Sequence, residues 1–399
     1  MTDWRATESR VYMTTGRRLS VVIVRGEGSR LWDEDGKAYL DFFGGHATAS
    51  LGHCHPVVVD ALTDQARTLI HFSNVVYSTP QLRLAELLVE HSCMDRVFFA
   101  NSGAEANEAA IKLARKWGRM HRSGAFEVIA AEQSFHGRTL TMVTAGGNER
   151  YSEPFGPLPP GFVHVPFNDI EALKRATNER TCAVLLEPVQ GEGGVNVPDD
   201  GYLPAVRRWC DEQRLLLIFD EVQTGIGRCG ALFAYQLWDV EPDVMTLAKG
   251  IASGVPLSAV LCKEHCAVFT PGDHGSTYGG SPLATRVGYE VVRHVIDNGL
   301  PAKVAADGEY LEQRLRSMED RLDLVSGHRG KGLLWAVALS REAAEEVTLR
   351  CLERGLIVNN VRPDTVRLAP ALSVSREELD EGLAILESVL AEVGGGAAK

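Results

Sequence analysis

The feature that most constrains the fold of this chain is a regular alternation of apolar runs and helical stretches that begins near residue 97. Helical patterns such as EANEAAIKLARKWGRM and LPAVRRWCDEQR separate the apolar runs. Six of these runs are hydrophobic at both odd and even positions, which is typical of strands covered on both faces. They are RVFFAN, FEVIAAE, TCAVLLEPV, RLLLIFDEV, DVMTLAK and LSAVLCK. We therefore predict an α/β fold with a mostly parallel central sheet.

The character of the sequence changes after about residue 290. A long helical stretch leads into GLLWAVAL, LIVNNV and TVRLAPAL, which charged helices separate. This order predicts a smaller α+β domain. We expect residues 1–55 to be an N-terminal segment that joins the small domain, residues 56–293 to form the large, ligand-binding domain, and residues 294–399 to form the C-terminal small domain.

Charge and cysteine content disfavour several classes of protein. The 399-residue chain has 41 Lys and Arg against 53 Asp and Glu, and a net charge of −12 argues against nucleic acid as a partner. No apolar run approaches about 20 residues, so we expect no membrane partner and a cytoplasmic location. The eight cysteines contain no C-x-x-C pair, and GHCHP (52–56) has no further ligands at zinc spacing. We therefore expect free thiols and no metal site.

Residues directly after the strands are the first candidates for function, because ligands on such sheets bind beyond the carboxyl ends of the strands. Ser102 and Glu105 fit an S-x-x-E capping box, and Gly103 lets the backbone approach an anion at the start of that helix. An ordinary helix cap explains these residues equally well. Further along, Phe135 could stack on a planar ring and Arg138 could hold a carboxylate, but core packing and surface exposure also explain them.

The stretch LLLIFDEVQTGIGRCG holds two patterns. Its last six residues, 225–230, match G-x-G-x-x-G, but four residues separate them from the strand and no helix begins cleanly after them. A dinucleotide site is therefore disfavoured. Asp220 ends a run of apolar residues, and a carboxylate buried there needs a cationic or donor partner. A protonated ring nitrogen would meet that need.

Lys249 is a lone cation where the strand DVMTLAK runs into a loop of small residues. Four strand ends would thus bring together a phosphate site at a helix start, the aromatic ring of Phe135, the carboxylate of Asp220 and this lysine. Pyridoxal 5'-phosphate requires such a set: a lysine that forms an imine with its aldehyde, and an aspartate that keeps the pyridine nitrogen charged. The sequence therefore predicts a pyridoxal phosphate site centred on Lys249.

Six motifs add a resemblance that covers the chain from about residue 25 to 390. FFANSGAEANEAAIKLARK, SFHGRT, LLEPVQGEGG, FDEVQTGIGRCG, TLAKG and HGSTYGG resemble, in this order, the motifs of class III (ornithine-type) aminotransferases. Within that family the sequence is most similar to acetylornithine aminotransferases. The resemblance implies the fold type I of pyridoxal phosphate-dependent transferases, with a large and a small domain.

The resemblance also implies roles around the cofactor ring. Lys249 would form the imine and later carry a proton between the substrate α-carbon and the cofactor. Asp220 would pair with the pyridine nitrogen, and Gln223 would hydrogen-bond the ring hydroxyl. Phe135 would stack on one face of the ring, with Val222 on the other.

The remaining cofactor contacts come from two regions. Ser102, Gly103 and Ala104 would hold the phosphate at their helix start, and His136 is counted among the cofactor-binding residues. Thr277, in GSTYGG, would reach the phosphate from the neighbouring subunit. The resemblance therefore implies a homodimer as the active unit.

Substrate recognition would rest on two arginines. Arg367 matches the family arginine that takes the α-carboxylate of glutamate and 2-oxoglutarate, and Glu192 matches the glutamate that neutralises it while the other donor binds. Arg138 would then take the α-carboxylate of acetylornithine. One departure concerns His46, which stands where acetylornithine enzymes usually have an aliphatic residue. It could alter the preferred amine, or be a partly exposed loop residue.

The resemblance favours transfer of the δ-amino group of N2-acetyl-L-ornithine to 2-oxoglutarate, which gives N-acetyl-L-glutamate 5-semialdehyde and glutamate in arginine biosynthesis. Rival donors on the same cofactor are succinylornithine, ornithine, 4-aminobutyrate and a carrier-bound amine of lysine synthesis. An aminomutase is disfavoured by the Glu192–Arg367 pair. A dinucleotide oxidoreductase would rest on residues 225–230 alone, and a noncatalytic binding module would have no use for Lys249 with Asp220.

Overall fold

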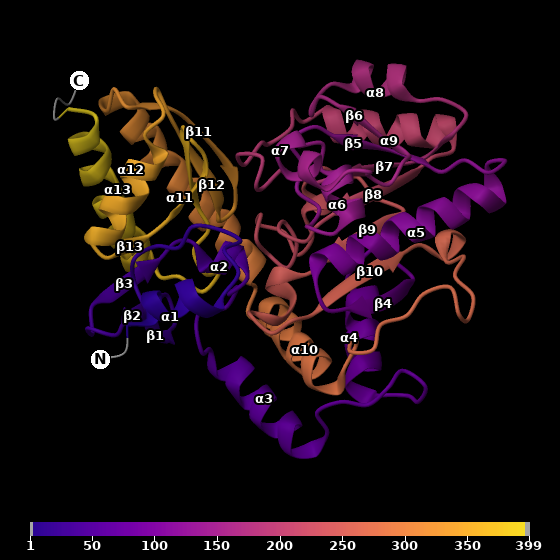
Figure 1. The fold of residues 1–399 in the computed structure, drawn as a ribbon, viewed down its shortest axis with the longest axis horizontal. Coiled ribbons are helices and arrows are strands. Elements are labelled where there is room, and N and C mark those ends of the chain that lie inside the picture. The colour runs from indigo at the N-terminus through magenta and orange to yellow at the C-terminus, as the bar shows by residue number, and fades with distance from the viewer. Residues whose placement is uncertain (1–2, 396–399) are drawn as a thin grey trace.

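The structure is a computed structural model and describes residues 3–395. The chain forms two lobes (Figure 1). One is built around a seven-stranded sheet and the other contains two four-stranded sheets. In the described part of the chain, no helix is long and apolar enough to cross a membrane.

The large sheet has the order β4-β10-β9-β8-β7-β5-β6. Its strands are β4 (Arg96–Ala100), β5 (Glu127–Ala131), β6 (Phe162–Val165), β7 (Thr181–Leu186), β8 (Leu216–Asp220), β9 (Val244–Leu247) and β10 (Ser258–Cys262). β10 alone runs opposite to the other six strands, so the prediction of an α/β fold with a mostly parallel sheet is confirmed. Six of the strands contain the six apolar runs. The edge strand β6 was missed because the sequence FVHV is short and His164 interrupts its apolar character.

The pleat of the central strands explains why both of their faces are apolar. Leu217 and Phe219 of β8 pack with the buried side chains of α9 (Tyr202–Gln213). Leu216 and Ile218, which point the other way, pack with those of α5 (Gly103–His121). Successive residues of a strand alternate between faces, so a sheet with helices on both sides needs apolar residues at every position.

Further helices complete the large lobe. They are α3 (Pro56–Thr68), α4 (Thr79–Glu90), α6 (Leu140–Ala145), α7 (Glu149–Ser152), α8 (Ile170–Ala176) and α10 (Pro282–Asp297), with the short helices η1 (Glu153–Phe155), η2 (Ala234–Leu237), η3 (Lys249–Ala252) and η4 (Glu264–Cys266). Residues 225–230 form turns and do not open an α-helix.

The small lobe combines the two ends of the chain, coloured indigo and yellow in Figure 1. One of its sheets joins β1 (Ile23–Glu27), β2 (Arg30–Asp33) and β3 (Ala38–Asp41) to β13 (Leu356–Ile357), and the other has the order β11-β12-β15-β14. The latter strands are β11 (Val325–Lys331), β12 (Leu334–Leu339), β14 (Asn359–Arg362) and β15 (Thr365–Leu368). The helices are α1 (Trp4–Val11), α2 (Gly44–Ala47), α11 (Leu300–Arg321), α12 (Ala344–Glu353) and α13 (Arg376–Val393).

Candidate active site

Six strands of the large sheet end at the same edge, because β4 and β9 both run antiparallel to β10 and because β5, β6, β7, β8 and β9 are parallel. A cavity of about 290 Å³ lies at this edge. Its lining includes eight of the predicted cofactor-binding residues: Ser102, Gly103, Ala104, Phe135, His136, Asp220, Val222 and Lys249. These residues therefore line one cavity beyond the carboxyl ends of the strands, where ligands bind on sheets of this kind.

Asp220 is the last residue of β8 and lies among hydrogen-bond donors. Its Oδ2 accepts from Asn107 Nδ2 at 2.7 Å and lies 2.7 Å from His136 Nδ1, while Oδ1 accepts from the Val222 amide at 3.0 Å. Although burial acts against it, the hydrogen bond and charge of His136 hold the pKa of Asp220 below its ordinary value. The same pairing raises the pKa of His136 against the effect of burial. The site thus keeps a charged carboxylate in the lining of the cavity.

The N-terminus of α5 offers an anion site on the same cavity. Ser102 caps the helix and accepts from the Glu105 amide at 3.3 Å, while the Glu105 carboxylate accepts from the Asn101 amide at 2.8 Å. Gly103 follows the cap, and a Cβ there would lie 2.8 Å from Val222 Cγ1. Free amides and the helix dipole at this end favour a phosphate.

Lys249 follows β9 by two residues and faces the same cavity. Its backbone is in the left-handed region, with φ 40°, which is a strained conformation for a residue with a side chain. Burial lowers its pKa; Glu192 opposes this shift and the Arg367 charge adds to it. A lowered pKa favours the neutral amine, which is the nucleophilic form.

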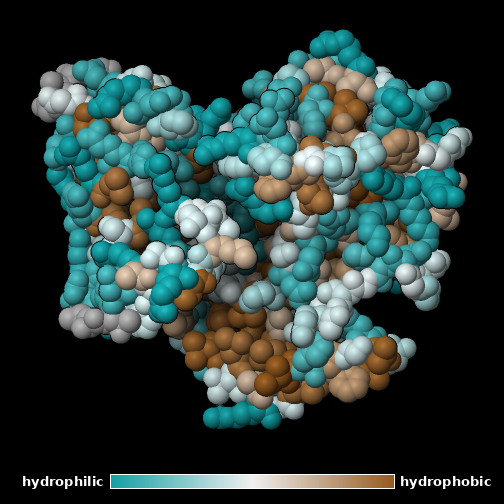
Figure 2. Space-filling view, in the orientation of Figure 1, coloured by the Kyte–Doolittle hydropathy of each residue, from teal (hydrophilic) through white to brown (hydrophobic). Residues whose placement is uncertain are grey.

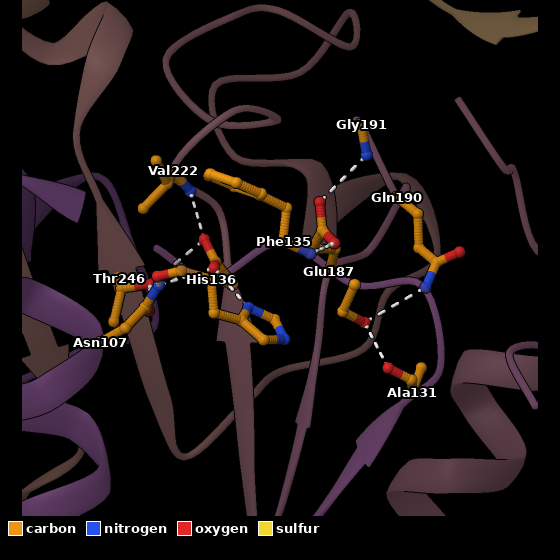
Figure 3. Close-up of polar contacts among 11 residues, drawn as sticks. Asn107, Ala131, Phe135, His136, Glu187, Gln190, Gly191, Val222 and Thr246 are labelled. Carbon is orange, nitrogen blue, oxygen red and sulfur yellow. Dashed lines mark hydrogen bonds and ion pairs between the residues drawn. The ribbon is translucent and has the colours of Figure 1, made fainter. Parts of the chain in front are cut away.

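Phe135 and Val222 line the cavity from the loops after β5 and β8. The Phe135 loop is anchored by Glu187, whose carboxylate accepts from the amides of Phe135 and Gly191, each at 3.0 Å (Figure 3). Burial raises the pKa of Glu187 to about 7. This one side chain therefore ties the aromatic loop to the loop that carries Glu192.

A second cluster of predicted residues meets beside the cavity. Arg367 on β15 donates from Nη1 to Glu192 Oε1 at 2.5 Å and to Gln223 Oε1 at 3.3 Å. The Arg367 side chain is fully buried, whereas that of Glu192 is 24% exposed. Against the opposing effect of burial, the nearby His46 ring, with Nδ1 3.7 Å from Oε1, and the charges of Arg367 and Lys249 hold the pKa of Glu192 well below its ordinary range. Glu192 and Arg367 therefore form a charged pair at physiological pH.

Two predicted residues belong neither to the lining of the cavity nor to the cluster around Arg367. Arg138 is exposed, and its guanidinium stacks over the ring of Tyr151 at 3.9 Å and over that of Phe135 at 5.2 Å. Thr277 is exposed on the segment that leads into α10. Within a single chain the structure does not bring Thr277 into the lining of the cavity.

Sequence reasoning missed several residues that orient this site. Thr246 Oγ1 donates to Asn107 Oδ1 at 2.7 Å, which turns the Asn107 amide group toward Asp220. Asn359 Oδ1 accepts from Arg367 Nε at 3.3 Å. Glu187 could have been found by the same rule as Asp220, since it directly follows β7. Asn107 and Thr246 carry no such pattern, because one lies within a helix and the other within a strand.

One group in the described residues has metal-ligand chemistry, and it lies outside the lining of the cavity. Ligand atoms of Asp243, His265 and Cys266 lie within 4.8 Å of one another. Arg207 Nη1 already donates to Asp243 Oδ2 at 2.8 Å, so one side of that carboxylate is occupied by a cation.

The residues around the cavity fit pyridoxal 5'-phosphate. Amides at the start of α5 suit the phosphate, Phe135 and Val222 suit the two faces of a flat ring, and Asp220 suits a protonated ring nitrogen. No hydrogen bond or ion pair within the described chain engages the Lys249 amine, which suits a covalent partner.

Comparisons with known proteins agree with this chemistry. Residues 11–390 match the family model for class-III aminotransferases. The chain is 48% identical over 387 residues to the acetylornithine aminotransferase of Caldanaerobacter subterraneus subsp. tengcongensis, which covers 97% of this chain and 98% of that protein. It is 46% identical over 372 residues to the succinylornithine transaminase of Photorhabdus laumondii, covering 92% of each.

Solved structures give the same result for the fold. The crystal structure of the ornithine aminotransferase from Toxoplasma gondii superposes with a TM-score of 0.94 at 34% identity, covering 98% of this chain and 95% of that one. The acetylornithine aminotransferase from Elizabethkingia anophelis superposes with a TM-score of 0.87 at 34% identity, covering 98% of each. The predictions of fold type I and of pyridoxal phosphate as cofactor are confirmed, and the chain belongs to the class-III aminotransferase family.

Proposed function

We propose that this chain transfers the δ-amino group of N2-acetyl-L-ornithine to 2-oxoglutarate, as a step of arginine biosynthesis. The observation that carries the choice of donor is 48% identity, over nearly the full length of both chains, to an acetylornithine aminotransferase. The arrangement of the site supports it, because a lysine, a buried aspartate and a Glu–Arg pair meet at one edge of the sheet.

Lys249 and Asp220 carry the chemistry in this proposal. Bound pyridoxal phosphate supplies an aldehyde that accepts the amino group and a ring that takes up the electrons of the broken C–H bond. Lys249 would hold the cofactor covalently, and its free amine would then move the proton at the substrate carbon. Asp220, held charged by His136 and Asn107, keeps the ring nitrogen protonated. Ser102, Gly103 and Ala104 would anchor the phosphate, and Gln223 would hydrogen-bond the ring hydroxyl.

The pair of Glu192 and Arg367 lets one site accept two kinds of substrate. While Glu192 holds Arg367 at 2.5 Å, the pair has no net charge and suits the uncharged middle of an ω-amine donor. When Glu192 releases it, Arg367 offers a buried guanidinium to the α-carboxylate of glutamate or 2-oxoglutarate. A ping-pong reaction needs both states in turn.

Arg138 is the proposed partner of the α-carboxylate of the acylated donor. Its guanidinium is exposed, and the stacking on Tyr151 and Phe135 holds it without neutralising it. None of the ion pairs found in the described chain includes Arg138, so its charge is available to a substrate carboxylate.

N2-Succinylornithine is the second candidate donor. The specific observation in its favour is 46% identity to a succinylornithine transaminase over 92% of each chain. The acyl groups differ at the end remote from the amine that reacts, so both donors make the same demands on Lys249, Asp220 and Arg138.

We further propose that the active unit is a homodimer. The described chain exposes an apolar segment at residues 69–77, in which Val75 is 82% and Tyr77 is 95% exposed. Hydrophobic surface gathers in the same region, over α3 and its neighbours at the bottom of Figure 2. A contiguous apolar surface of this kind is typical of an interface. Asn74 of this segment donates to the carbonyl oxygens of Ser276 and Gly279, at 3.3 and 3.0 Å.

The loop that carries Thr277 is therefore fastened to the proposed interface. A second copy packed there would receive Thr277 at its own phosphate site. We also propose the three-part domain division at residues 55 and 293. The second boundary falls in the last turns of α10.

We propose a cytoplasmic location. It is supported by the eight cysteines, all of which are free thiols and lie within residues 3–395.

The visible absorption spectrum of the purified protein tests the proposal. We expect a yellow band that bleaches on addition of N2-acetyl-L-ornithine without a keto acid and returns on addition of 2-oxoglutarate. The second-order rate constants for acetylornithine, succinylornithine, ornithine and 4-aminobutyrate then rank the donors. A band that persists with acetylornithine but bleaches with another of these amines would refute the choice of donor and keep the family chemistry.

A further inference from the structure

His46 lies on a strained turn that points at the Glu192–Arg367 pair. Residues 44–47 have φ values of 56°, 57°, 62° and 63°, so the short element α2 is a left-handed turn. The left-handed conformation costs about 1–2 kcal/mol for each residue that has a Cβ. The first two residues are glycines and avoid this cost, but His46 and Ala47 do not. Strain of this kind persists where the surrounding structure requires one particular placement of a side chain.

The ring of His46 is placed by contacts on two sides. The rings of His46 and Phe43 meet edge to face with their centroids 4.4 Å apart. The His46 backbone carbonyl accepts from Gln223 Nε2 at 3.5 Å. On the other side, His46 Nδ1 lies 3.3 Å from Arg367 Nη2 and 3.7 Å from Glu192 Oε1. The side chain is 59% exposed, so solvent protons reach it. His46 thus lies close to both members of the pair.

We call the Glu192–Arg367 pair closed while Glu192 holds Arg367. The geometry then defines the protonation state of His46 in the closed pair. A guanidinium only donates hydrogen bonds, so Nδ1 must be the acceptor and carries no proton. His46 is therefore neutral when it holds Arg367 Nη2, with its proton on Nε2. Protonation would place a donor on both nitrogens. The Nδ1–H group would then repel Arg367 and donate to Glu192 Oε1. In the structure that oxygen accepts from Arg367 Nη1.

We infer that His46 is a positioning residue whose protonation sets how firmly Glu192 holds Arg367, and thereby the balance between the two half-reactions. Neutral His46 fastens Arg367 to the closed pair, which favours the ω-amine donor. Protonated His46 donates to Glu192 in place of Arg367, which leaves Arg367 free to bind the α-carboxylate of a dicarboxylate. This inference rests on the proposed alternation of substrates at the pair.

The charged groups around His46 come from three elements besides its own. They are Arg367 on β15, Glu192 on the loop after β7 and Lys249 on η3; α2 packs against η3. Arg367 and Lys249 are positively charged and Glu192 is negatively charged. Glu192 Oε1 lies 3.7 Å from His46 Nδ1.

The test measures each half-reaction separately in single turnovers of the holoenzyme from pH 6 to pH 9. The absorbance of the cofactor reports the second-order rate constants for glutamate, which needs the free Arg367 guanidinium, and for N2-acetylornithine, which needs only that no unneutralised Arg367 charge faces it. In the native protein we expect the ratio of glutamate to acetylornithine rate constants to rise about tenfold as pH falls, which corresponds to about 1.4 kcal/mol at 25 °C.

His46→Asn is the decisive variant. Asparagine tolerates the left-handed conformation, and its Oδ1 accepts from Arg367 as Nδ1 does, but it does not titrate. We expect its ratio to be independent of pH and to equal the native ratio at pH 9. His121→Asn, an exposed histidine at the end of α5, should keep the native pH profile. His46→Gln is a second nontitrating variant, and the yellow band of each variant shows that its site is formed.

A ratio that changes with pH in His46→Asn as it does in the native protein would overturn the inference, as would a native ratio that does not change with pH. Failure of the proposed donor looks different. Acetylornithine would then fail to react at any pH, while glutamate and 2-oxoglutarate still exchange. The pH dependence of the glutamate rate constant in the native protein and in His46→Asn would in that case decide the role of His46.

Discussion

Replacing Arg367 by alanine tests the two-substrate site most directly. In the proposed open state its guanidinium binds the α-carboxylate of 2-oxoglutarate by two charge-assisted hydrogen bonds. Such bonds contribute about 1.5–3 kcal/mol each, and less than their sum when they share one partner. A loss of about 3–4 kcal/mol corresponds to a fall of about 100- to 1000-fold in the second-order rate constant for 2-oxoglutarate.

The amine half-reaction of Arg367→Ala should suffer much less. In the proposal Arg367 does not touch N2-acetylornithine, and the chief change is that Glu192 loses its partner at 2.5 Å. Glu192 is 24% exposed, so water compensates for part of that loss. We expect a fall of less than about tenfold, which corresponds to less than about 1.4 kcal/mol.

Stopped-flow absorbance of the bound cofactor measures both half-reactions in one preparation. Arg341→Ala is a suitable control, because this arginine lies in the small lobe and donates only to the Val393 carbonyl oxygen, at 2.8 Å, among the hydrogen bonds of the described chain. It should leave both rate constants unchanged. Equal damage to the two half-reactions in Arg367→Ala would refute the assignment of Arg367 to the dicarboxylate alone.

Three further predictions concern other parts of the molecule. Lys249→Ala should bind pyridoxal phosphate only noncovalently and lose turnover; borohydride reduction followed by mass spectrometry should attach cofactor to the native protein alone, and retained turnover would exclude Lys249 as the catalytic amine. Burial raises the pKa of both Glu187 and Glu221 to about 7, above the ordinary value of 4.5. The folded protein therefore binds more protons than the unfolded chain between those pH values, and stability falls as pH rises through that window. Melting curves should show a smaller fall in Tm from pH 5 to pH 8 in Glu221→Gln than in the native protein, and an equal fall would contradict this origin. Tyr77→Glu places a charge on the proposed interface and should shift the molar mass measured by light scattering toward the monomer, with loss of bound cofactor if Thr277 acts across that interface.

The sequence predicted the large lobe well because each strand and helix of that lobe is marked by a pattern within its own short stretch of sequence. Each buried strand has its own apolar run, and parallel strands necessarily end at one edge of the sheet. Asp220 and Lys249 could therefore be placed near one another from their positions at strand ends alone. The edge strand β6 escaped prediction because it is short and a histidine interrupts its apolar residues. The orientation of Asn107 and Thr246 toward Asp220 also left no pattern in the sequence.

What the sequence by itself determined is the set of reactive groups and the sheet edge that gathers them. The tertiary structure alone decided how the small lobe completes the site. Arg367 meets Glu192 across 175 positions of the chain, and His46 reaches Arg367 across 321. Such contacts depend on how the two lobes pack and on the left-handed turn at residues 44–47, which no local periodicity encodes. The physical reason is that strand ends follow from backbone geometry within one sheet, whereas contacts between lobes follow from the packing of the whole chain.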